Sequence, residues 1–251
     1  MDPFLIAFAA LGAMVGSFVG VVAERIYTGQ SFVTGRSRCN SCRRELGVLD
    51  LVPVLSWMVS RGRCRSCGSR VPASYLALEG VLAFLFALSY GFLGFSLLLA
   101  VMLAALVVLA FIVVYDIRHT IVLPEASTFL VFLSLVAAYL SSPSLASLGA
   151  TLAVAGAIAF FFFLLHALSR GRAMGLGDTP VAFSLSLLVG PAALPGLLFS
   201  FWIGALFGIG ILVARGRGPT MGIEVPFVPF MAIGFLLAYF TGWNPLALAL
   251  F

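Results

Sequence analysis

The stretch Met174-Gly175-Leu176-Gly177-Asp178-Thr179-Pro180 places a carboxylate in a chain that is otherwise almost wholly apolar. A charged side chain near hydrocarbon is costly, so an acid in such a place indicates a functional site. The glycines on either side of Leu176 let another backbone approach the acid closely. The alternative is that Asp178 only caps a helix with Pro180 in its first turn, where proline is allowed. A second acid, Asp116, favours the functional interpretation because of where the chain places both.

The composition predicts an integral membrane protein. Hydrophobic residues make up 62% of the 251 residues and charged residues only 9%, whereas soluble domains carry roughly a quarter charged residues. All 14 basic residues are arginine. The sequence pI near 9.4 therefore indicates arginines that flank membrane segments rather than nucleic-acid binding. The first apolar run, after Asp2, is longer than that of a cleavable signal peptide.

The apolar runs predict an all-α fold with about eight transmembrane helices, since roughly 20 apolar residues cross a bilayer. Gly12, Gly16 and Gly20 recur on one face of the first span, which favours close packing on another helix. The predicted spans are Phe4–Ile26, Tyr75–Tyr90, Ser96–Tyr115, Pro124–Leu140, Ser147–Leu168, Thr179–Val189, Leu194–Ala214 and Val225–Phe240.

The arginines predict the orientation. If the N-terminus lies outside, the polar loop after the first span and the turns 116–123, 169–178 and 215–224 are all cytoplasmic. Every arginine then falls on the cytoplasmic side, as the positive-inside rule requires. Asp116 and Asp178 share that side, near the inner edge of the bilayer. We therefore expect residues 1–26 to form the first transmembrane helix, 27–74 a cytoplasmic cysteine domain, and 75–251 a polytopic membrane domain.

Two carboxylates that face each other cannot both ionise cheaply, so they share one proton and can activate a water between them. This is the chemistry of aspartic proteolysis, in which one acid takes a proton from water and the other protonates the carbonyl oxygen or the leaving amine. By itself, Asp116 also fits an interfacial acid paired with Arg118 or His119. A proton-coupled transporter is a further alternative, but transporters usually hold such acids near the midplane and show internal repeats.

The four cysteines, Cys39, Cys42, Cys64 and Cys67, form two Cys-x-x-Cys pairs in the polar loop. Their separation, residues 43–63, is slightly longer than in usual four-thiolate zinc sites. Two disulfides are the competing interpretation, which a reducing cytoplasmic loop disfavours. Four thiolates leave zinc no open position, so the metal would be structural.

Other polar residues carry weaker signals. Glu79, Glu125 and Glu224 lie on the predicted cytoplasmic side and could receive a basic peptide, although acids also suit helix starts. His166 fits a packed or interfacial histidine, and His119 lies close to Asp116 in the sequence.

Taken together, these motifs resemble the prepilin peptidases, bacterial membrane enzymes that process type IV prepilins and type II secretion pseudopilins. The resemblance covers nearly the whole chain. It rests on the cysteine pairs and on the segments Gly16-Ser17-Phe18, Leu49–Trp57, Arg61–Cys64, Tyr115-Asp116, Leu123-Pro124, Gly175–Asp178 and Val225–Phe230.

The resemblance implies that Asp116 and Asp178 are the catalytic pair of a Gly-x-Gly-Asp aspartic protease, supported by Gly175 and Gly177. It implies cleavage of a short basic leader after glycine, in the bacterial inner membrane. Many members also methylate the new N-terminus with S-adenosylmethionine, and no separate nucleotide-binding fingerprint is present here. The family often has a lysine shortly after the second aspartate, which Thr179-Pro180-Val181 lacks. The alternatives are a presenilin-like or preflagellin peptidase, which lack the cysteine loop, and a non-enzymatic transporter or scaffold with a zinc-ribbon module.

Overall fold

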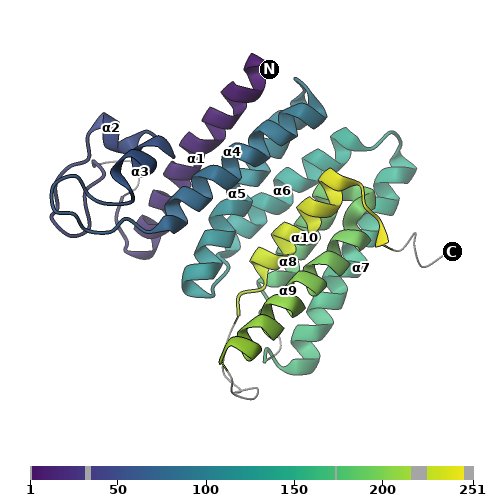
Figure 1. Cartoon of the computed structure of the whole chain (residues 1–251). Coiled ribbons are helices and arrows are strands. Elements are labelled where there is room, and N and C mark those ends of the chain that lie inside the picture. Colours follow the sequence, from purple (N-terminus) through teal and green to yellow (C-terminus); the bar gives the residue numbers. More distant parts are fainter. Residues whose placement is uncertain (1, 32–34, 173, 216–224, 246–251) are drawn as a thin grey trace. The chain divides into compact units, whose positions relative to one another are not determined.

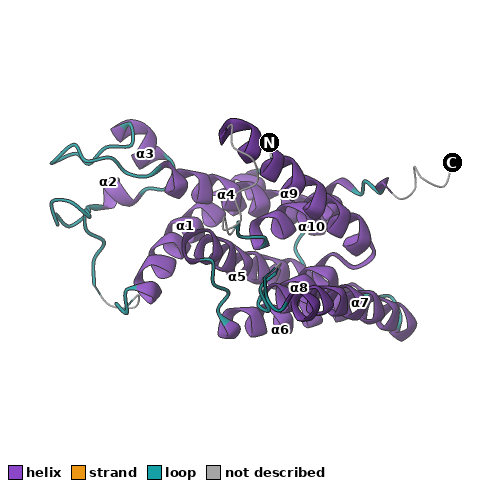
Figure 2. Cartoon of the chain, turned by 90° about the horizontal axis from the view of Figure 1, so that it is seen from below, coloured by secondary structure: helices purple, strands orange, loops and turns teal. Residues whose placement is uncertain are grey.

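The computed structural model describes residues 2–31, 35–172, 174–215 and 225–245. The chain divides into two compact units, Met1–Leu99 and Ala100–Phe251. Within the described ranges, regular structure is entirely helical (Figures 1 and 2). The only β-type pairings there are two isolated bridges, Arg38 with Glu45 and Arg63 with Arg70. The predicted all-α class is therefore confirmed for this part of the chain.

The first unit is built on two long helices, α1 (Pro3–Tyr27) and α4 (Ala73–Leu93), with the short helices α2 (Val48–Leu51) and α3 (Leu55–Ser60) in the loop between them. The glycine face of α1 packs on α4, as the four-residue spacing predicted. A Cβ at Gly16 would lie 2.9 Å from the Cα of Glu79, and one at Gly12 would collide with the Leu82 carbonyl. The absence of side chains therefore lets the two backbones touch.

The second unit contains the remaining helices. They are α5 (Leu97–His119), α6 (Pro124–Ser141), α7 (Leu145–Ser169), α8 (Asp178–Val189), the 3-10 turn η1 (Gly190–Ala192), α9 (Ala193–Arg215) and α10 (Val228–Thr241). Helix α8 lies at the centre and packs against α6, α7, α9 and α10. Its side chains are almost all buried, including Ser184 and Ser186, whose hydroxyls donate to carbonyls one turn back. The stretch that begins with Asp178 is therefore the core helix of this unit.

Six helical stretches of the described chain are long and apolar enough to cross a membrane: α1, α4, α5, α6, α7 and the continuous stretch Asp178–Ala214. The predicted sixth and seventh spans, Thr179–Val189 and Leu194–Ala214, both lie within the single stretch Asp178–Ala214. A helix as short as α8 extends about 18 Å, less than the hydrocarbon thickness of about 30 Å. Helix α10 has 14 residues and is also short. The count of eight crossings is not confirmed and stays a prediction, as does the orientation.

Candidate active site and metal centre

Asp116 lies in the last turn of α5 and is buried. An acid there opposes the helix dipole, so helix stability does not explain its presence. Its carboxylate accepts a hydrogen bond from the backbone N–H of Val228, at the start of α10. Its Oδ2 atom is buried and has no hydrogen-bond partner among the described residues. A buried carboxylate oxygen without a protein partner is available to a shared proton or a water.

Asp178 is the first residue of α8 and is also buried. The residue at the N-cap is Gly177, so capping does not account for the acid. The turn before α8 is closed by the Asp178 N–H, which donates to the Gly175 carbonyl at 3.3 Å. The Gly175 N–H in turn donates to the Asp178 carboxylate. The Gly-Leu-Gly-Asp turn therefore holds its own acid in place.

Gly177 brings the two acid-bearing segments together. A Cβ at this position would lie 2.7 Å from the Cβ of Val122, in the loop after α5. A Cβ at Gly175 would meet no atom closer than 3.7 Å. The second glycine of the motif thus admits the Val122 side chain, whereas the sequence predicted the close approach of another backbone.

The structure brings Asp116 and Asp178 near enough for their charges to interact. They come from different helices of the same unit, α5 and α8. Sequence reasoning did not find the contribution of the Val228 amide, although the prolines of Val225–Phe230 mark that segment. Sequence reasoning also did not predict the contact that His166 makes with the loop before α8. Its Nδ1 lies 3.0 Å from the Met174 carbonyl, so this histidine ties the end of α7 to the loop that carries the motif.

The glutamates predicted to receive a basic peptide have separate surroundings. Glu79 is buried in α4 of the first unit and accepts the Val54 N–H at 2.7 Å. Glu125 is exposed in the first turn of α6. Glu224 lies outside the described residues. A role in substrate binding therefore stays a prediction for all three.

The four predicted metal ligands converge. The Sγ atoms of Cys39, Cys42, Cys64 and Cys67 all lie within 4.8 Å of one another, and none forms a disulfide. The Cys39 and Cys67 sulfurs are 3.8 Å apart. This is the spacing of two ligands in a tetrahedral site with metal–sulfur bonds of about 2.3 Å, since such ligands lie about 3.8 Å apart. The cluster can therefore hold a metal ion.

The two Cys-x-x-Cys pairs sit in matching turns. The Cys39 N–H donates to the Arg44 carbonyl at 2.9 Å, and the Cys64 N–H donates to the Ser69 carbonyl at 2.8 Å. In both turns the residue after the second cysteine has a positive φ, 60° at Arg43 and 69° at Gly68. This matching geometry points all four thiols toward one centre.

The surroundings of the thiols favour ligand chemistry. Hydrogen bonds from the Cys42 backbone N–H and the Ser69 hydroxyl lower the pKa of Cys39 to about 5. The Ser69 hydroxyl also lowers the pKa of Cys67. At Cys42, the Arg44 N–H favours the thiolate, but desolvation and the neighbouring thiols outweigh it and raise the pKa to about 11. A cation at the centre would relieve this crowding of negative charge.

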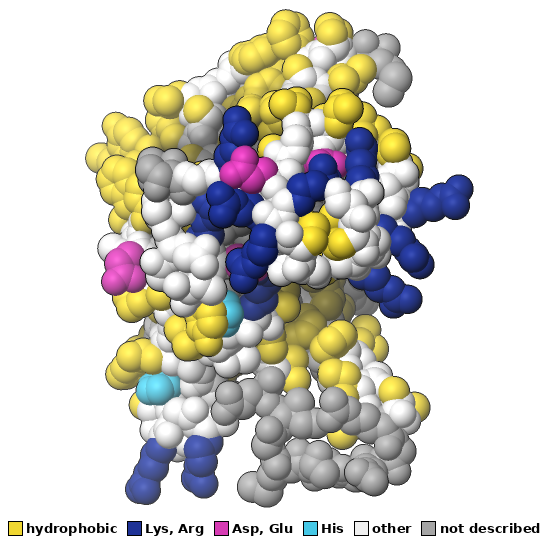
Figure 3. Space-filling view, turned by 90° about the vertical axis from the view of Figure 1, so that its left-hand side faces the viewer, with side chains coloured by type: hydrophobic (Ala, Val, Ile, Leu, Met, Phe, Trp, Pro, Cys, Tyr) yellow, Lys and Arg dark blue, Asp and Glu magenta, His cyan; other side chains and the backbone are white. Residues whose placement is uncertain are grey.

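Arginine side chains gather on the face of the molecule shown in Figure 3, and several arginines of the cysteine loop form ion pairs. Arg36 and Arg38 pair with Glu45 at 3.2 and 2.9 Å. Arg44 and Arg65 pair with Asp50 at 2.8 and 3.3 Å. The Asp50 carboxylate also accepts a hydrogen bond from the N–H of Gly47, the residue that precedes α2.

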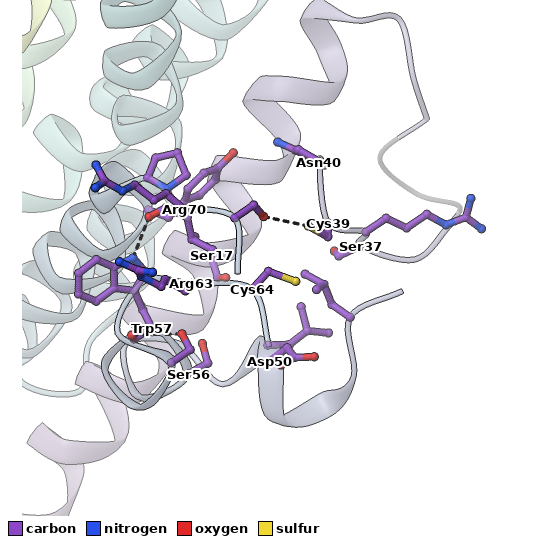
Figure 4. Close-up of a pocket in the computed structure, with 18 of the residues that line it drawn as sticks. Ser17, Ser37, Cys39, Asn40, Asp50, Ser56, Trp57, Arg63, Cys64 and Arg70 are labelled. Atoms are coloured by element: carbon purple, nitrogen blue, oxygen red, sulfur yellow. Dashed lines mark hydrogen bonds between the residues drawn. The ribbon is translucent and has the colours of Figure 1, made fainter. Parts of the chain in front are cut away.

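A cavity of about 240 Å³ lies between the cysteine turns, α3, and the facing sides of α1 and α4 (Figure 4). Its lining combines carboxylates, guanidinium groups and aromatic rings, among them Glu24, Glu79, Arg63, Trp57 and Tyr75. The Tyr75 hydroxyl donates to Glu24 at 2.6 Å. This cavity belongs wholly to the first unit.

Comparison with known proteins defines the class. Residues 10–92 match the sequence model of the bacterial peptidase A24 N-terminal domain, and residues 103–213 match that of the type IV leader peptidase family. The chain belongs to the type IV leader peptidase family.

Its similarity to named relatives extends over most of the chain. It is 34% identical over 232 residues to a prepilin leader peptidase/N-methyltransferase of Bacillus subtilis (strain 168), covering 92% of each chain. It is 34% identical to the protein of that name from Myxococcus xanthus (strain DK1622), covering 86% of this chain and 66% of the relative. A Dichelobacter nodosus protein of the same name is 29% identical, covering 96% and 93%. No solved structure matches the chain.

Proposed function

We propose that this chain is a membrane aspartic endopeptidase that removes the basic leader from type IV prepilins or pseudopilins after glycine. The observation that carries the proposal is the buried pair Asp116 and Asp178, held by the Val228 amide and the Gly175 amide. The names of the relatives and the family match support the substrate class.

The geometry suits general acid–base cleavage of a peptide bond. One carboxylate takes a proton from a water as the water oxygen attacks the scissile carbonyl carbon. The other, protonated carboxyl group donates its proton as the C–N bond breaks and the new amine leaves. The Oδ2 atom of Asp116, without a partner among the described residues, is available for this shared proton. Burial limits competition from bulk water and strengthens these interactions.

A gel shift tests the proposal. The chain is co-expressed with a pilin-like substrate, and wild type is compared with Asp178→Asn and with Asp2→Asn, whose acid caps α1 in the first unit. We expect cleavage by wild type and Asp2→Asn, and uncleaved substrate with Asp178→Asn. Cleavage by Asp178→Asn at the wild-type rate would refute the assignment of Asp178. The match of residues 10–92 to the family's N-terminal domain disfavours the presenilin-like, preflagellin and transporter alternatives, because it covers the cysteine loop.

Zinc is the metal that the donor set fits best. Four cysteine sulfurs within 4.8 Å of one another fill a tetrahedral site and leave no open position, which is characteristic of structural zinc. The ion would be held by Cys39, Cys42, Cys64 and Cys67 and would stabilise the loop of residues 27–74.

Methylation of the new N-terminus is the second activity, which the relatives' names support. S-adenosylmethionine would supply the methyl group from its sulfonium. The mixed lining of the cavity suits this zwitterionic donor, because carboxylates and aromatic faces stabilise its sulfonium and guanidinium groups stabilise its carboxylate. Glu24, Trp57 and Tyr75 would hold it there. Calorimetric titration of the purified protein with S-adenosylmethionine tests this, with Glu24→Gln expected to weaken binding and Glu45→Gln, outside the cavity, expected to leave it unchanged.

For location, we propose the bacterial inner membrane, with the N-terminus outside and the cysteine loop and both aspartates on the cytoplasmic side. The arginine distribution supports this orientation. The type IV prepilin leader would then meet the aspartates without crossing the bilayer.

A further inference from the structure

Helix α3 exposes apolar residues and turns serines inward, which is the reverse of a helix on a water-facing surface. Its inner residues Ser56, Trp57 and Ser60 line the cavity against α1 and α4 (Figure 4). Its outer residues Leu55, Met58 and Val59 expose 60%, 60% and 74% of their surface. A helix on a water-facing surface instead buries its apolar stripe and exposes its polar one.

The short helix α2 also exposes apolar side chains, since Val48 and Leu49 expose 82% and 69% of their surface. We call Leu55, Met58 and Val59 of α3 the outer apolar face. A group of large apolar side chains on a short loop marks a surface that something apolar covers.

The position of α3 identifies what covers it. The cavity behind α3 is lined by Ser17 of α1 and by Glu79 of α4, and Glu79 accepts the N–H of Val54, just before α3. Ser17 lies about 15 Å before the end of α1 at Tyr27, and Glu79 about 9 Å after the start of α4. Both helices are candidate membrane spans. The start of α3 therefore lies beside the first turns of α4, while its Trp57 donates a hydrogen bond to the Val71 carbonyl just before α4 begins. Helix α3 lies where the candidate spans meet the cysteine loop.

An exposed basic residue follows the outer apolar face directly. Arg61 ends α3 in a left-handed conformation, with φ 51°, whereas Arg63 and Arg70 line the cavity and Arg65 pairs with Asp50. Guanidinium groups bind phosphate oxygens in a bidentate manner. An apolar face bordered by arginines is typical of helices that lie in the membrane interface.

We propose that the outer apolar face is embedded in the boundary between headgroups and acyl chains of the leaflet on the loop side, while the exposed Arg61 binds a lipid phosphate. The cysteine loop is then a membrane-surface domain. Its own contacts with lipid hold it against the bilayer, in addition to its attachment to α1 and α4. Lipid is the partner expected to cover this face, because α3 lies next to the candidate spans and a positive charge lies beside it. A pilin segment seated on the same face is the rival outcome.

Photocrosslinking in lipid nanodiscs tests this proposal. A photoreactive residue replaces Val59 in the full chain, and the nanodisc contains a lipid tagged on its acyl chain. The matched control replaces Arg43, an exposed residue that lines a second cavity together with Thr28 and Gln30, past the end of α1. We expect strong lipid capture at Val59 and weak capture at Arg43. Equal capture at both, or none at Val59, would overturn the proposal.

Further arms make the outcome decisive. Metal content confirms that each variant is folded, and the photoreactive residue is placed at Met58 if the Val59 variant loses its metal. Replacing Arg61 by glutamine should lower capture in nanodiscs with phosphatidylglycerol and leave it unchanged with phosphatidylcholine alone. When a pilin-like substrate is added, lipid capture should persist. Replacement of lipid capture by crosslinks to the substrate would show that the face is a substrate surface.

Discussion

Asp116 and Asp178 stand at opposite ends of their helices, the first in the last turn of α5 and the second at the first residue of α8, and both are buried where their charges interact. The Asp178 position is favoured by the helix dipole and the Asp116 position is opposed by it. The two carboxyl groups therefore lie in different electrostatic surroundings. This suits a pair in which one carboxyl group holds a proton and the other accepts one.

We predict that Asp116→Asn and Asp178→Asn each lower leader cleavage by about 10²–10⁴-fold or more, the range of a lost general acid or base. The double variant should be no slower than either single variant, because the residues act as a unit. Cleavage of a purified pilin-like peptide measures this. Additive losses would contradict a shared mechanism.

Gly177→Ala should lower both stability and cleavage, because the new Cβ would lie 2.7 Å from the Cβ of Val122. Such overpacking costs about 1–3 kcal/mol. Gly175→Ala is the matched control and should be milder, since its nearest atom is 3.7 Å away. Adding Val122→Gly, which removes the Val122 Cβ, should restore part of the loss in Gly177→Ala, as thermal denaturation and cleavage assays would show. No rescue would mean that crowding against Val122 is not the cause.

Purified protein should contain about one zinc per chain, with Zn–S distances of about 2.3 Å by X-ray absorption. Each single cysteine-to-serine change should lower the content sharply. Acidification should release the metal because protons compete for the thiolates. If none of the four cysteine-to-serine changes lowered the zinc content, the assignment of these cysteines as metal ligands would be wrong.

Asp50→Asn should make the cysteine loop more sensitive to protease at neutral pH. Burial raises the pKa of Asp50, but the Gly47 N–H and Arg44 outweigh it and hold the pKa below the ordinary value of 3.8. A carboxylate with a lowered folded-state pKa contributes stability above its unfolded pKa and loses it as the pH falls through the folded pKa. The difference between wild type and Asp50→Asn should therefore stay constant from pH 8 to pH 5. A difference that fades within that range would contradict the ion pairs as its source.

The orientation predicts which side reagents can reach. Arg118 and Arg172 are exposed at the ends of α5 and of the α7–α8 loop. Cysteines that replace them should react with an impermeant thiol reagent only from the cytoplasmic side, as mass spectrometry of inverted and right-side-out vesicles would show. Labelling from outside would invert the proposed topology.

The sequence by itself determined the long apolar helices, the glycine face of α1 and the thiol cluster. Long apolar runs have one low-energy solution in lipid, because every backbone polar group must be satisfied within the segment. The spacing Gly12, Gly16, Gly20 places three small residues on one face whatever the partner, and paired Cys-x-x-Cys turns have few geometries that satisfy four thiols. These features depend on local periodicity and spacing, so they could be read from the residues.

Tertiary structure alone decided which residues complete the site. The Val228 amide reaches Asp116 only because α10 packs in the same unit, and Val122 meets Gly177 only when the loop after α5 folds against the turn before α8. The outward face of α3 likewise depends on its docking against α1 and α4. Short helices such as α3 and α8 have weak periodicity of their own, and their partners are distant in the chain. Their placement is therefore settled by packing, which the sequence pattern does not encode locally.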